Sequence, residues 1–219
     1  MASSSAPVSV FDEHCFRKEF NQELFESHAR RRKVIPEVGF DLNEDEYRQI
    51  IEQLMLTGWR RLAAPHTSVS KLLVQEFYAN AAISDEETAE QDELPYKSFV
   101  RGIKPAVPIQ LRRTELHPLA KGWQEFIIHS LVPMGNKSEV TIARAILIHC
   151  IMRGEQVGAE DIIADNMAVI AQGLPNKGNL AFPSTNYKLC KDAGVPLREF
   201  RRTPRILELS YITARRIDA

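Results

Sequence analysis

The run from Val140 to Met152 is the most hydrophobic stretch of the chain, and it constrains the fold more than any other segment. Only Thr141, Arg144 and His149 interrupt it. Its remaining apolar residues recur at the spacing of one broad helical face. That face, which we expect to be buried, comprises Val140, Ala143, Ile146, Leu147, Cys150 and Ile151. Ser138 is the expected N-cap of this helix, because serine side chains accept hydrogen bonds from the first-turn amides.

Other segments carry the same helical repeat of apolar residues. They cover about residues 11–29, 43–58, 69–82, 119–132, 159–171 and 183–194. Ser68 or Ser70 can cap the third of these segments, and Trp123 and Phe126 are expected core residues of the fourth. The chain is therefore predicted to be mainly α-helical, with six to seven short helices and at most a minor β-hairpin or a few short strands.

We expect one helical domain over residues 11–196, flanked by two segments of different character. Residues 1–10 are small and polar, and an N-terminus of this composition is expected to be disordered. Residues 84–93 hold six acids and no base, which predicts a loop inside the domain. Residues 96–103 alternate like a short strand. Residues 197–219 form a basic C-terminal tail, for which disorder is again expected.

Composition restricts the partners and the location. The net charge of −1 gives no overall attraction to nucleic acid or to an anionic membrane. Three cysteines without a framework spacing favour a reducing compartment, and no long uncharged apolar run or secretory signal is present. We expect an intracellular protein of the cytosol or nucleus that is not associated with a membrane.

No motif predicts chemistry. The sequence contains no Cys-x-x-Cys, no Gly-x-Ser-x-Gly and no phosphate-binding glycine loop. Cys150 lies in mid-helix, where no helix N-terminus lowers a thiol pKa. Asp161 and Asp165 share a helix face, but no third ligand accompanies them, and a solvated surface is the simpler interpretation. We therefore expect no catalytic residue, metal site, cofactor or small-molecule substrate.

Two basic segments leave nucleic-acid binding open. The first is Arg30, Arg31, Arg32 and Lys33. The second lies in the tail and includes Arg198, Arg201, Arg202 and Arg205. The first run follows a predicted helix, so its cations can simply complement the negative end of the helix dipole. Alternatively, either segment can form a patch that binds phosphates.

A series of ordered motifs resembles a known family. They are IPEVGFDL (35–42), LMLTGW (54–59), FYAN (77–80), VRGI (100–103), LHPLAKGW (116–123), HSLVPMGNKSEVT (129–141), RAILIHCIMRG (144–154), FPS (182–184) and LCKDAGVP (189–196). Together they resemble the putative plant transposon protein domain, which occurs in open reading frames derived from plant retroelements. The resemblance covers about residues 30–196. No catalytic residues are established for that family, so the resemblance implies none here.

One departure from the family concerns residues 103–115. Family members usually place several dozen residues between the VRG-type strand and the LHPLAKGW-type helix, whereas this chain has only a short junction containing Pro105 and Pro108. The chain resembles an internally shortened member. The leading hypothesis is a non-enzymatic, retroelement-derived protein with a gag-like or accessory assembly role, acting by self-association through apolar faces that the shortened core leaves exposed. The alternative is a nucleic-acid-binding module that acts through the basic tail.

Overall fold

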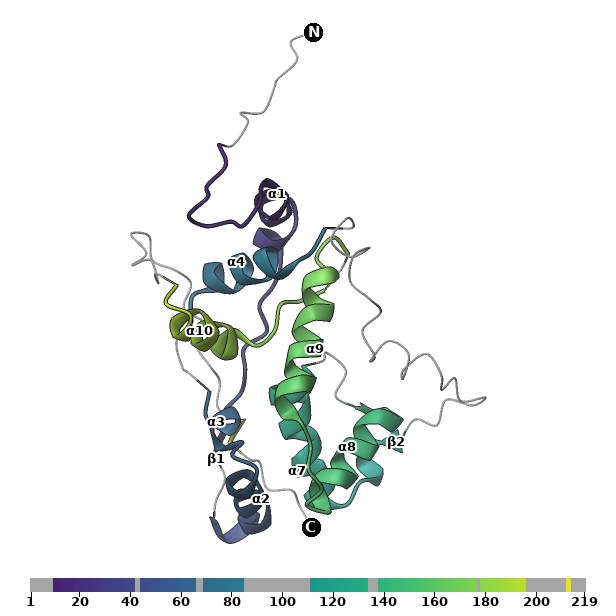
Figure 1. The fold of residues 1–219 in the computed structure, drawn as a ribbon. Helices are drawn as coiled ribbons and strands as arrows, with labels where there is room; N and C mark the ends of the chain where they lie inside the picture. Colours follow the sequence, from purple (N-terminus) through teal and green to yellow (C-terminus); the bar gives the residue numbers. More distant parts are fainter. Residues whose placement is uncertain are drawn as a thin grey trace.

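The computed structural model describes residues 10–41, 44–65, 69–84, 111–133, 138–176, 178–195 and 212–213. In them the chain is mainly helical, as predicted (Figure 1). The strand expected at 96–103, nearly all of the acidic segment 84–93, and Arg198, Arg201, Arg202 and Arg205 of the tail lie outside the described residues.

Eight α-helices and four short strands make up the described architecture. The helices are α1 (Glu19–Ser27), α2 (Glu44–Leu56), α3 (Arg60–Ala63), α4 (Lys71–Ala81), α7 (Pro118–Phe126), α8 (Ile142–Met152), α9 (Ala159–Gln172) and α10 (Pro183–Asp192). Short 3-10 turns cover Ala29–Arg31 and Arg113–Glu115. Strand β1 (Phe40–Asp41) pairs in parallel with β4 (Ile212–Thr213), and β2 (Leu111–Arg112) pairs antiparallel with β3 (Glu139–Val140). Among the described residues, no helix is both long and apolar enough to cross a membrane.

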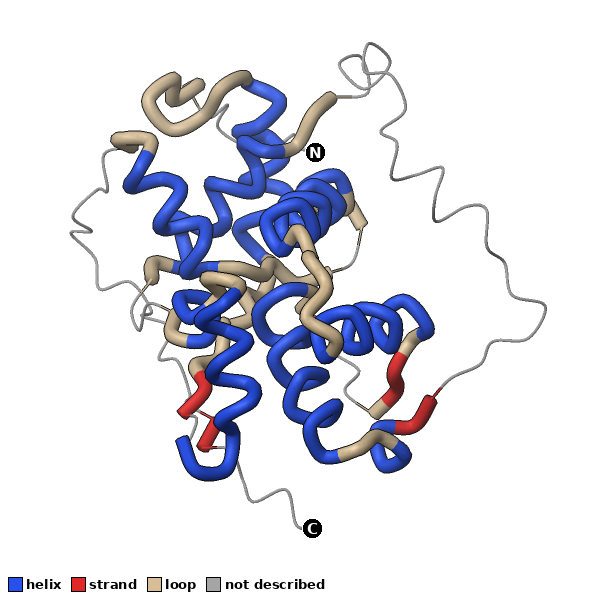
Figure 2. Tube along the Cα trace, turned by 60° about the horizontal axis from the view of Figure 1, so that its bottom comes forward, coloured by secondary structure: helices blue, strands red, loops and turns tan. Residues whose placement is uncertain are grey.

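The helices form two connected groups. Helix α4 packs against α1, α10 and α9, which gathers these elements around it (Figures 1 and 2). Helix α7 packs against α8 and also contacts α2. One continuous hydrophobic core runs through both groups. The elements before residue 84 and those after residue 111 therefore fold together.

Phe126 joins three parts of this core. Its ring lies 5.7 Å from that of Trp123 in a perpendicular contact and 6.1 Å from that of Trp59 in a stacked contact. The ring of Phe40, in β1, lies 5.8 Å away. Trp123 and Phe126 are both buried, as the helical repeat predicts. Aromatic contacts of this kind add to the burial of large apolar area, so Phe126 should be a principal determinant of stability.

Helix α7 continues as a π-helix over Ile127–Leu131, which the sequence pattern did not predict. All five of its residues are buried. The Ser130 hydroxyl donates to the Leu62 carbonyl oxygen over 3.2 Å, which ties the π-turn to α3. The wider turn places both His129 and Leu131 inside, a combination that an α-helical wheel does not give.

The predicted inner face of α8 is wrong in part. Ile146 is 57% exposed and Ala143 is also exposed, whereas Leu147 and Cys150 are half-buried and Ile151 is buried. The reason is that the helix begins later in the sequence than predicted. Val140 is buried within β3, not within the helix, and the Thr141 hydroxyl accepts from the Arg144 amide as the N-cap instead of Ser138. The face that points inward is consequently Arg144, Ile148 and Ile151.

Smaller differences occur in other helices. Helix α1 is shorter than its pattern suggests, so Phe16 is buried ahead of it while Phe20 on the helix is exposed. Met55 of α2 is also exposed. The Ser70 cap of α4 is confirmed, since its hydroxyl accepts from the Leu73 amide over 3.4 Å.

Candidate interaction surface

The outer side of α8 is an open apolar strip. It comprises Ile142, Ala143, Ile146 and Cys150, which we call the α8 strip. The two isoleucines are 38% and 57% exposed. Residues at i and i+4 lie above one another on a helix, so Ile142, Ile146 and Cys150 form a single row. This is the region that the sequence predicts to be the buried centre of the fold.

The strip is open because α8 packs mainly against α7. The inner side of the helix is anchored by an arginine. Arg144 is buried, and its Nη1 donates to the Glu139 carbonyl oxygen over 3.2 Å. Burial lowers the pKa of this guanidinium below its ordinary value. With a cation held on the inner side, rotating the helix to bury Ile146 would move Arg144 away from its partner.

Cys150 is not set up for chemistry. A hydrogen bond with the Glu155 side chain raises the pKa of its thiol, and desolvation acts in the same direction. A thiol with a raised pKa stays protonated at neutral pH and is a weak nucleophile. Its place in the α8 strip is therefore that of a small apolar group.

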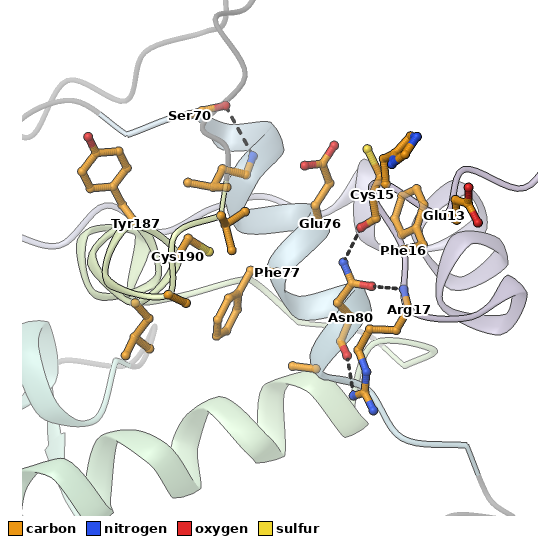
Figure 3. Close-up of a pocket in the computed structure, with 16 residues that line it drawn as sticks. Glu13, Cys15, Phe16, Arg17, Ser70, Glu76, Phe77, Asn80, Tyr187 and Cys190 are labelled. Carbon is orange, nitrogen blue, oxygen red and sulfur yellow. Dashed lines mark hydrogen bonds between the residues drawn. The ribbon is translucent and has the colours of Figure 1, made fainter.

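A concave surface lies elsewhere, between α4, α10 and residues 13–17 (Figure 3). It encloses about 880 Å³ and is lined by apolar groups such as Leu73, Phe77 and Tyr187. Its polar end is occupied by internal bonds. The Asn80 side chain accepts from the Arg17 amide over 2.9 Å and donates to the Cys15 carbonyl over 2.8 Å, which fastens the N-terminal segment onto α4. These contacts are structural, and they leave the groove with mainly apolar walls.

The basic run before β1 is partly engaged within the protein. Arg30 pairs with Glu26 at 2.9 Å, and the Arg32 guanidinium donates to the Leu174 carbonyl oxygen. Arg31 and Lys33 are exposed. Of the four cations in this run, Arg31 and Lys33 are therefore presented to solvent without a side-chain bond that holds them against the fold.

A buried carboxylate that the sequence did not single out holds the start of α10. Glu37 accepts from the Ser184 amide over 2.6 Å and from the Thr185 hydroxyl over 2.9 Å. These bonds cap the helix from another part of the chain, next to Phe182, whose left-handed backbone (φ 52°) turns the chain into α10. Burial raises the pKa of Glu37, although the hydrogen bonds oppose this.

Residues of the ordered motifs make contacts between distant parts of the fold. Glu37 belongs to IPEVGFDL and contacts the serine of FPS. Tyr78, from FYAN, donates from its hydroxyl to the Ala181 carbonyl over 3.0 Å. In LHPLAKGW, a Cβ added at Gly122 would lie 2.8 Å from Ile50 Cδ1, so the glycine permits the close approach of α2 and α7. The motifs therefore describe packing and capping contacts of one fold.

Residues 103–196 match the model of the putative plant retrotransposon-related domain. The relationship to plant retroelements that the motifs indicate is thereby confirmed for this part of the chain, and it indicates a transposable-element origin. No curated protein and no solved structure matches the chain.

The matched retrotransposon-related segment is not a separate structural unit. It contains α7 to α10, but Glu37 and Tyr78, which precede it, hold the start of α10. Within the described part of the chain, no three histidine, cysteine or acidic side chains are grouped so as to hold a metal ion. Among the described residues, the α8 strip is an exposed apolar row to which no contact within the fold gives a structural role.

Proposed function

We propose that this chain is a non-enzymatic assembly protein derived from a plant retroelement, with a gag-like or accessory role, and that it acts by associating with further copies of itself. The observation that supports the proposal is the open α8 strip on the most apolar helix of the protein.

Exposed apolar residues are common on protein surfaces and usually need no explanation when they are scattered. Those of α8 differ because they form one row on one helix. A helix that is apolar on all sides is normally covered on all sides. Here Ile148 and Ile151 are covered by the fold, and Ile142 and Ile146 are not.

Sedimentation of the purified chain tests the proposal. We expect the weight-average mass to rise above that of the 24.9 kDa monomer as the concentration increases from micromolar to several hundred micromolar. A strict monomer over the whole range would overturn the proposal. A cooperative thermal melt of the same sample verifies that the folded protein is measured.

Nucleic-acid binding is the second candidate, favoured by the exposure of Arg31 and Lys33. It also relies on Arg198, Arg201, Arg202 and Arg205 of the tail. Binding by these cations would weaken steeply with salt. Replacing these four arginines by glutamine preserves chain length and the strand β4. Unchanged affinity for single-stranded RNA in that variant would exclude these four residues as the contacts, and unchanged affinity in Arg31→Gln/Lys33→Gln would exclude the first patch.

A further inference from the structure

We draw no further inference here: the strongest candidate, the apolar groove between α4, α10 and residues 13–17, is lined by acidic and basic side chains alike, and nothing in the described part of the structure shows what covers it.

Discussion

Helices α7 and α8 are packed against each other, yet they use their apolar residues differently. In α7, Trp123 and Phe126 are both buried in the core, and the Phe126 ring contacts Trp59, between α2 and α3, and Phe40 of β1. In α8, the buried row includes an arginine, and two isoleucines face outwards. The comparison shows that apolar content alone does not assign a residue to the core. What decides is whether another element covers the face on which the residue lies.

Phe126→Ala should cause the largest loss of stability, and it tests the buried side of the comparison between α7 and α8. Phe126 is almost fully buried and meets Trp123, Trp59 and Phe40, so truncation leaves a cavity between three elements. We expect a loss of about 3–5 kcal/mol in the free energy of unfolding. Urea denaturation followed by tryptophan fluorescence measures it. A loss below about 1 kcal/mol would show that the ring cluster does not hold α7 in place.

A second, smaller loss of stability is expected from substituting Glu37. Glu37→Ala removes the acceptor of the Ser184 amide and the Thr185 hydroxyl. Leaving such groups without a partner costs about 1–3 kcal/mol. Thr185→Val is the matched control, since it removes only one of the two bonds and should cost less. Equal losses in the two variants would place the whole effect on the hydroxyl.

The contribution of Glu37 to the free energy of unfolding changes with pH in a direction that follows from its pKa. Its pKa in the folded protein lies above the ordinary value of 4.5, so the folded state binds the proton more tightly than the unfolded state. The contribution of this group is therefore most favourable at low pH and is lost as pH rises from 4.5 through the folded pKa. Relative to Glu37→Gln, the unmodified protein should lose stability over that interval. Urea unfolding at a series of pH values from 4.5 upwards measures the difference, and a difference that does not change with pH would contradict it.

A third comparison concerns the start of α8. Thr141→Ala removes the observed N-cap and should cost about 1 kcal/mol. Ser138→Ala, at the cap position that the sequence predicts, should cost much less, because β3 separates it from the helix. Thermal melts of the two variants measure this difference. A negligible loss in Thr141→Ala would mean that its hydroxyl does not cap α8.

The same region shows how far the sequence could predict the fold. Helix content, the Ser70 cap and the inward Trp123 are set by local spacing and capping, and sequence patterns report such features well. The outward direction of Ile146 depends on the pairing of Val140 with Leu111, a contact between distant segments. Apolar residues occupy most positions of this helix, with Arg144 and His149 as its polar ones, so the pattern alone did not fix which side faces inward. Glu37 was missed for a similar reason, since its partners lie almost 150 residues away.

The smallest effect on stability should come from Ile146→Ala, and it is the one that most directly contrasts α8 with α7. Because Ile146 is 57% exposed, its truncation opens no cavity in the monomer. Alanine also has the higher helix propensity, so the free energy of unfolding should change by no more than about 0.5 kcal/mol. Association should nevertheless weaken, because the apolar area that the α8 strip can bury against a second copy becomes smaller. Denaturation at low protein concentration together with sedimentation at high concentration separates these effects. A loss of about 2 kcal/mol or more in the free energy of unfolding of the monomer would mean that Ile146 is a core residue and that this face of α8 is covered within the fold.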